Sequence, residues 1–285
     1  MKPADITRRI QAYNTAPVTD FCGLSPNQMH ALTSNPLGPG SPVALRAALP
    51  DEVLNQVPLL RLTEAFLGIL QREGSLKLTA LGALPRKYLH ELYALGLLRE
   101  ADVDSGLIKL NREIDSTVLT TVHLNTVLAG LARKAHGKLA LTKKGEALRQ
   151  PEQRPALLRL VLDTFANRFN WAYFDRYNSA TAGQSAWAYS VYLLLKFGDE
   201  PRPIQFYADL YQRAFPFVLA TFPDMRYMSQ EQQLTSCYSN RVFFRFTHWF
   251  GLVEMGERSY RLNGEGTIVA ASALLPQLFS SELSS

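Results

Sequence analysis

Residues 118–149 constrain the fold more than any other stretch, because they contain signals for a helix, a hairpin and a second helix in direct succession. The first helix should end at Gly130 and bury one apolar stripe, made of Leu124, Val127, Leu128 and Leu131. Two short alternating segments then flank His136-Gly137, where a tight hairpin turn is expected. Thr142 follows, in the position from which its side chain would cap the next helix.

A second copy of this pattern lies near the C-terminus. Residues 251–269 read GLVEMGERSYRLNGEGTIV and follow an apolar helical segment, as GLARKAHGKLALTKKGEAL does at residues 130–148. In the later copy we predict strands at 252–254 and 259–262. Asn263 then takes the capping position. The repetition predicts that one structural plan is used at least twice.

A partial copy, LKLTALGAL, occupies residues 76–84 and follows a helical apolar pattern at residues 53–73. It predicts a short strand and a short helix. Residues 97–100 and 107–110 are predicted to form two further strands, joined by a turn at Asp104-Ser105-Gly106.

The LTKKG segment at residues 141–145 resembles the wing end of winged-helix regulators, in which a pattern like LTxxG follows the last strand. The resemblance implies a mostly α fold with short β-hairpins (α+β), built from tandem winged-helix-like units. We divide the chain accordingly into a proline-rich N-terminal arm with one short helix (1–52), a first winged-helix-like unit (53–114), a partial second unit (115–150), an aromatic helical connector (151–186) and a third unit (187–285).

Longer segments, GLSPNQMHAL, LKLTALGALPRKY, LARKAHGKLALTKKGEAL and FNWAYFD, are similar to parts of an uncharacterised group of bacterial proteins. They are spread over residues 20 to 215. The resemblance implies a bacterial or mobile-element intracellular protein and supplies no catalytic residue.

Composition limits the classes that remain. No apolar run has the length of a signal peptide at the N-terminus or of a membrane span elsewhere, so we expect a cytoplasmic protein without a membrane partner. Cys22 and Cys237 are far apart and lack histidines at ligand spacing, so neither a disulfide nor a metal site is expected. The formal charge of +5 permits an anionic partner such as duplex DNA.

The sequence contains none of the common catalytic or nucleotide-binding motifs in context, and its five histidines are scattered. We therefore expect no enzymatic activity and no cofactor.

The densest basic cluster lies on the predicted hairpin and the start of the following helix, and it predicts contacts to nucleic-acid phosphates by Arg133, Lys134, Lys138, Lys143 and Lys144. A different interpretation is that these charges only solvate the hairpin and keep its edge from pairing with another chain.

Residues that could contact base edges are Asn240, Arg241, Arg245 and Lys87, since Asn and Arg suit that role and lie opposite the expected buried stripes. Phe244, on the same side as Arg241, instead suggests burial. The central helix is expected to present Val122, Asn125, Thr126 and Ala129 outward, with no cation. The competing hypothesis is therefore a scaffold that binds a protein partner through winged-helix units without binding DNA.

Overall fold

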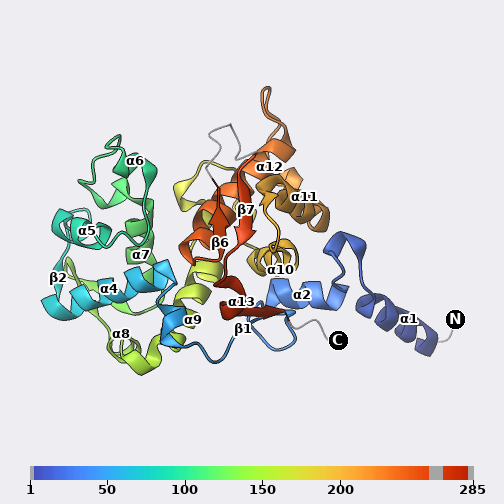
Figure 1. The fold of residues 1–285 in the computed structure, drawn as a ribbon, viewed down its shortest axis with the longest axis horizontal. Coiled ribbons are helices and arrows are strands. Elements are labelled where there is room, and N and C mark those ends of the chain that lie inside the picture. Colours follow the sequence, from blue (N-terminus) through green and yellow to red (C-terminus); the bar gives the residue numbers. More distant parts are fainter. Residues whose placement is uncertain (1–2, 257–265, 282–285) are drawn as a thin grey trace. The chain divides into compact units, whose positions relative to one another are not determined.

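The computed structural model describes residues 3–256 and 266–281, and in these residues helices predominate over three small antiparallel sheets (Figure 1). The mostly helical α+β class expected from the sequence is confirmed. No helix of the described residues is long and apolar enough to cross a membrane. The chain divides into a central unit, residues 47–170, and a terminal unit, residues 1–46 together with 171–285.

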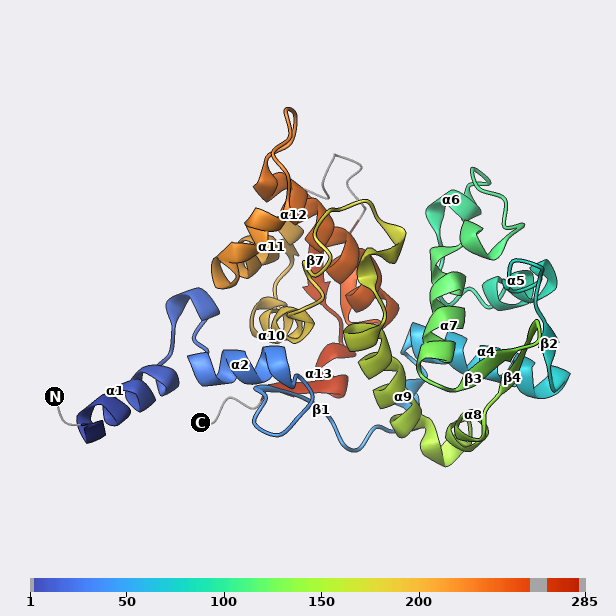
Figure 2. The same cartoon turned by 180° about the vertical axis from the view of Figure 1, so that it is seen from behind.

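The central unit contains one three-stranded antiparallel sheet in the order β2-β4-β3 (Figure 2). Its elements, in chain order, are α3 (Asp51–Leu54), α4 (Pro58–Glu73), β2 (Leu76–Lys77), α5 (Arg86–Tyr93), α6 (Ala101–Asp104), η2 (Glu113–Asp115), α7 (Thr117–Leu128), β3 (Ala132–Ala135), β4 (Lys138–Leu141), α8 (Lys143–Leu148), η3 (Pro151–Gln153), α9 (Arg154–Asp163) and η4 (Thr164–Arg168). The sheet joins β2 to strands that lie more than 50 residues later, so segments that we assigned to two successive units share one sheet.

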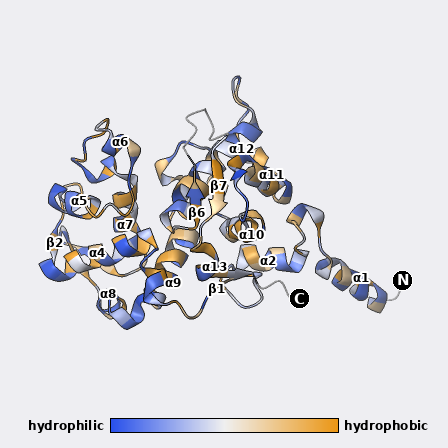
Figure 3. Ribbon diagram, in the orientation of Figure 1, coloured by the Kyte–Doolittle hydropathy of each residue, from blue (hydrophilic) through white to orange (hydrophobic). Residues whose placement is uncertain are grey.

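The helical pattern predicted at residues 53–73 corresponds to two helices, α3 and α4, with a break at residues 55–57. Pro58 occupies the first turn, where a missing N–H costs nothing, and Gly74 follows the helix with φ of +65°. The predicted buried stripe of α4 is confirmed, with Leu59, Leu62, Phe66, Leu67 and Leu70 all at most 2% exposed. Hydrophilic residues predominate along α5 and α8, which lie at the surface of this unit (Figure 3).

Helix α7 corrects one prediction. The four residues expected to face outward, Val122, Asn125, Thr126 and Ala129, are at most 2% exposed, whereas Leu128 of the expected stripe is 40% exposed. The helix contacts α4, α5, β3, η2 and η4, so neighbours within the central unit surround it. The Asn125 amide donates to the carbonyl of Val161 in α9, 3.2 Å away. A helix packed on several sides has no single apolar stripe.

The predicted strands at 97–100 and 107–110 are wrong. Residues 101–104 form the short helix α6, and neither flanking segment is a strand. The Tyr93 hydroxyl accepts from the amide of Glu100 at 3.0 Å and donates to the Asp104 carboxylate at 2.8 Å. Arg99 pairs with the same carboxylate. These local polar contacts stabilise a helical turn instead of a hairpin. Residues 80–84, predicted as a short helix, form a turn.

The terminal unit contains two sheets, β1-β8 and β5-β7-β6. Its elements are α1 (Pro3–Thr15), η1 (Thr19–Phe21), α2 (Pro26–Ser34), β1 (Val43–Leu45), η5 (Trp171–Phe174), α10 (Trp187–Phe197), β5 (Arg202–Pro203), α11 (Ile204–Ala214), η6 (Pro216–Thr221), α12 (Gln230–Tyr238), η7 (Ser239–Thr247), β6 (Val253–Met255), β7 (Ile268–Ala271), α13 (Leu275–Leu278) and β8 (Phe279–Ser281). Ser25 caps α2: its side chain accepts from the amide of Gln28, and the Gln28 side chain accepts from the amide of Ser25. Strand β1, from the proline-rich arm, pairs with β8.

Aromatic side chains fill the core of the terminal unit. Trp171 and Trp187 both pack against Phe246, with ring centroids 5.3 and 5.5 Å apart. The aromatic residues that follow residue 170 therefore pack in the core of this unit.

The two units contain modules with the same order of elements. The main elements of each module follow the order helix, strand, helix, helix, strand, strand. These are α4-β2-α5-α7-β3-β4 in the first module and α10-β5-α11-α12/η7-β6-β7 in the second. In both sheets the last strand in chain order, β4 or β7, is central. The first strand, β2 or β5, lies on one side of it and the second strand, β3 or β6, on the other. The repetition seen in the sequence thus corresponds to a shared topology.

The junction after the third helix is also shared. Gly130 and Gly251 both have φ of +71°, and the amide of the next residue bonds back to Thr126 O at 3.0 Å or Thr247 O at 2.7 Å. This is a Schellman arrangement, which satisfies the last carbonyls of the helix. After the last strand, Thr142 Oγ1 donates to Gly130 O at 2.7 Å, and Ser272 Oγ donates to Gly251 O at 2.6 Å.

Ser272, not Asn263, therefore matches Thr142. The predicted strand 259–262 and Asn263 lie outside the described residues, and the described partner of β6 is β7.

Candidate nucleic-acid interface

The basic hairpin, formed by β3, β4 and the turn between them, is built by a tight two-residue turn. His136 and Gly137 have φ of 49° and 70°, the left-handed conformation that a type I′ turn needs at both central positions. Glycine adopts positive φ freely, and histidine does so less readily. A two-residue turn of this type leaves one pairing of the two strands, and so it fixes the register of the hairpin. Ala135 consequently pairs with Lys138, and Arg133 with Ala140.

All five residues predicted to contact phosphate are exposed: Arg133, Lys134, Lys138, Lys143 and Lys144. The structure gathers them on the hairpin and on the first turn of α8, as their sequence positions indicate. Thr142 caps α8, its side chain accepting from the amide of Gly145 at 3.0 Å, which confirms that prediction.

Two of the five cations have local partners. Lys144 Nζ donates to Ala129 O at 2.9 Å, at the C-terminal end of α7, where the helix dipole favours a positive charge. Lys134 Nζ lies 3.5 Å from Gly82 O. Among the described residues, the ion pairs do not include Arg133, Lys138 or Lys143. These three charges are therefore available to an external anion.

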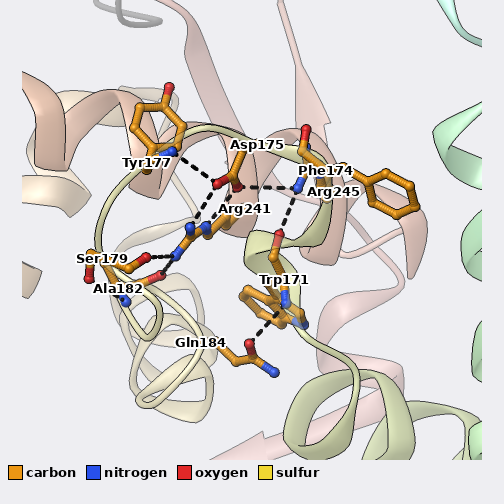
Figure 4. Close-up of polar contacts among 9 residues, drawn as sticks. All are labelled: Trp171, Phe174, Asp175, Tyr177, Ser179, Ala182, Gln184, Arg241 and Arg245. Atoms are coloured by element: carbon orange, nitrogen blue, oxygen red, sulfur yellow. Dashed lines mark hydrogen bonds and ion pairs between the residues drawn. The ribbon is translucent and has the colours of Figure 1, made fainter.

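The two arginines predicted to contact bases, Arg241 and Arg245, belong to the terminal unit and bind other residues of that unit (Figure 4). The Arg241 guanidinium is 0% exposed and binds the Asp175 carboxylate through two bonds of 2.8 Å each. Its remaining donors reach Ser179 O at 2.9 Å and Ala182 O at 3.1 Å. Burial lowers the pKa of Arg241, but the hydrogen bonds that it donates to Asp175, together with the charge interactions with its neighbours, outweigh burial, and the net direction is upward.

Arg245 is held by the same segment. Its Nη1 donates to Trp171 O at 2.9 Å and lies 3.4 Å from Asp175, while Nη2 donates to Phe174 O at 3.2 Å. Burial lowers the pKa of Arg245 from the ordinary arginine value. The predicted base contacts by Arg241 and Arg245 are corrected accordingly, because the buried Arg241 and the half-buried Arg245 both anchor residues 171–182 of the terminal unit.

Asn240 is half-buried and borders a cavity of about 440 Å³ whose lining also includes Tyr177 and Asn178. Lys87 is exposed and lies 5.1 Å from the centroid of the Tyr88 ring. It belongs to α5, the second helix of its module, not the third. Of the three candidates in the terminal unit, Arg241 and Arg245 thus bind residues 171–182, and only Asn240 borders the cavity.

Other polar side chains of the central unit are engaged in packing. His123 Nδ1 lies 2.8 Å from the Glu113 carboxylate, and both side chains are buried. The second carboxylate oxygen of Glu113 accepts from the amide of Leu84. The described residues contain no group of three or more side chains arranged to hold a metal ion.

Sequence reasoning missed one residue, Lys77, and one pairing, that of Asp175 with Arg241. Lys77 in β2 is exposed and pairs across the sheet with Lys138, although more than 50 residues separate them in the sequence. The Asp175 carboxylate forms a buried ion pair with Arg241, so the Arg241 side chain does not reach the surface. The alternation Leu76-Lys77-Leu78 was a signal for an outward Lys77, but its partner strand was not evident.

Comparison with known proteins finds one family model that is similar to a segment of the chain. Residues 55–156 match the family described as the Y4jL N-terminal domain. The match lies inside the central unit and spans the first module. It carries no activity, ligand or partner. No curated protein and no solved structure matches the chain.

Proposed function

We propose that this chain is a cytoplasmic nucleic-acid-binding protein in which two winged-helix modules are combined, and that the basic hairpin is the wing that contacts phosphate. The order of elements and the sheet order of both modules support the winged-helix assignment. The family match is compatible with this proposal and does not extend it.

One observation carries the proposal. Arg133, Lys138 and Lys143 are exposed, close in the fold, and have no carboxylate partner among the described residues. Isolated cations that project from a hairpin are suited to the regular negative charge of a phosphate backbone. Phosphate contacts position a protein on a duplex without specifying sequence.

The test is duplex binding at a series of salt concentrations. The variant replaces the five predicted phosphate contacts, Arg133, Lys134, Lys138, Lys143 and Lys144, by Gln. The matched control replaces five exposed cations from other segments, Arg8, Arg9, Lys109, Arg213 and Arg226, by Gln, and so removes the same formal charge.

We expect fluorescence anisotropy to show salt-dependent binding by the wild-type protein and the control, and a loss of most affinity in the hairpin variant. Equal loss in both variants would mean that only total charge matters. Undetectable binding by the wild-type protein at low salt would refute the proposal.

A scaffold that binds a protein partner is the second candidate. It is favoured by the third helices of both modules, since α7 is buried and Arg241 and Arg245 are anchored inside the terminal unit. This candidate predicts that the wild-type protein does not bind a duplex at low salt, so the same titration separates the two functions.

A further inference from the structure

The outward face of the sheet β2-β4-β3 carries a pair of lysines directly opposite each other. Lys77 and Lys138 are cross-strand partners, and the neighbouring pair, Leu76 and Leu139, is buried. Because side chains alternate along a strand, the lysines project from the face opposite to the leucines. Like charges in directly opposed positions destabilise a sheet.

A third cation lies on the same face. Arg133 pairs with Ala140, two residues beyond Lys138 on β4, so it projects to the same side as Lys138. Arg133 and Lys138 are diagonal neighbours, a separation that long side chains can bridge. The other outward residues of the paired strands are Ala135 and Ala140, which do not obstruct access to the three cations.

The described residues provide no carboxylate that pairs with Lys77, Arg133 or Lys138. The three charges therefore repel one another in the free protein. An anion that enters between them would relieve this repulsion, and a phosphate group offers enough oxygens to accept from all three side chains.

We propose that Lys77, Lys138 and Arg133 form a binding site for a backbone phosphate of duplex nucleic acid on the outward face of the sheet. The inference rests on the proposed function and deepens it, since it extends the contact surface from the basic hairpin across β4 to β2. Lys77 is the new member, and it comes from the other end of the module in sequence.

The experiment compares Lys77→Gln with Lys109→Gln in the full chain. Lys109 is an exposed lysine of the same unit that lies outside the sheet, so both variants lose one surface charge. Affinity for a fluorescently labelled duplex is measured at several salt concentrations, and unfolding by urea is measured at low salt without nucleic acid.

We expect Lys77→Gln to weaken binding severalfold at low salt and to reduce the slope of log K against log salt by about 0.9, the value for one lost phosphate contact. The same substitution should raise the urea midpoint, because it removes the opposed lysine pair. Lys109→Gln should leave both measurements at the wild-type values. Opposite effects on binding and stability would not arise from a merely structural role.

The sheet-face phosphate site and the proposed nucleic-acid-binding function can be refuted separately. If the hairpin variant loses binding while Lys77→Gln keeps the wild-type slope, the sheet-face site is wrong and the proposed function stands. If the wild-type protein does not bind a duplex, the proposed function is refuted and this site with it.

Discussion

Asp175 is the residue on which the interior of the terminal unit depends most directly. Its side chain is 4% exposed and receives both bonds of Arg241, while Arg245 lies 3.4 Å away. A single carboxylate thus compensates two guanidinium groups in a buried position. Such an arrangement is sensitive to loss of the one negative charge, because an uncompensated buried charge is costly.

Asp175→Asn should therefore lower the free energy of unfolding by about 3–5 kcal/mol, the range for breaking a buried ion pair. Chemical denaturation followed by tryptophan fluorescence measures the change, since Trp171 and Trp187 lie in this unit. Asp209→Asn is the control, because Asp209 is exposed and should change stability by less than about 0.5 kcal/mol. A loss of similar size in both variants would contradict the role of Asp175.

The misplacement of Arg241 in the sequence analysis has a physical cause. Residues 239–247 form a π-helix, in which hydrogen bonds run from i to i+5. A helical wheel drawn with 3.6 residues per turn therefore assigns these side chains to the wrong faces. The partner carboxylate, 66 residues earlier in the sequence, gave no local signal. Capping by Ser25 and Thr142, which depends on neighbours in sequence, was predictable.

At the scale of an element, the LTKKG segment shows how a short motif determines one local junction. The Thr142 side chain joins the end of α7 to the start of α8, through Gly130 O and the amide of Gly145. A Cβ atom at Gly145 would collide with the carbonyl of Leu131 and lie 3.2 Å from Leu141. The threonine and the glycine are thus both required for the close approach of α8 to the hairpin.

Gly145→Ala should destabilise the protein by about 1–3 kcal/mol, as expected for overpacking against backbone atoms. The control is Gly68→Ala in α4, where a Cβ atom would meet nothing within 4 Å. That change should stabilise by about 0.5–1 kcal/mol, since alanine favours a helix interior. Urea titration of both variants checks the opposite signs, and a neutral Gly145→Ala would disprove the packing argument.

The N-terminus of α7 gives a prediction that depends on pH. Glu100 accepts from Ser116 Oγ and, at 2.9 Å, from the amide of Thr117, but burial raises its pKa above the ordinary glutamate value. Folding therefore favours the protonated form. The contribution of this titration to stability is fully present below the ordinary pKa and is lost as pH rises through the raised value.

The stability of the wild-type protein relative to Glu100→Gln should accordingly fall as pH rises above the ordinary pKa of a glutamate. Urea unfolding at a series of pH values measures the difference, with Glu52→Gln as an exposed control from the same unit. A difference that does not vary with pH would show that Glu100 does not titrate in this way.

Elements were predictable where their signals were local. Helix α4 and the hairpin at His136-Gly137 follow from spacing and turn residues alone. The segment 97–110 was mispredicted because Tyr93, from the preceding helix, organises it through Glu100 and Asp104. The buried face of α7 could not be deduced, because α9 and η4 cover it from later in the chain.

At the scale of the molecule, a module is repeated, and its third helix is largely buried in both copies. In the first module, η4 packs on α7, and Asn125 of α7 donates to the carbonyl of Val161 in α9. In the second, residues 171–182 are anchored on η7 by Arg241 and Arg245. Winged-helix proteins that identify a sequence insert this helix in the major groove. Neither copy presents it in that way.

Binding to duplex nucleic acid should therefore be independent of sequence. Since one good bidentate base contact is worth about 1–3 kcal/mol of discrimination, we expect duplexes of unrelated sequence and equal length to differ by less than about fivefold in affinity. Competition titrations at constant salt test this, with the hairpin variant as the control for phosphate contact. A preference of about a hundredfold for one sequence would require base contacts by surfaces other than α7 and η7. The expected result would assign the affinity to phosphate alone, in agreement with exposed cations on the hairpin and buried arginines on the third helix.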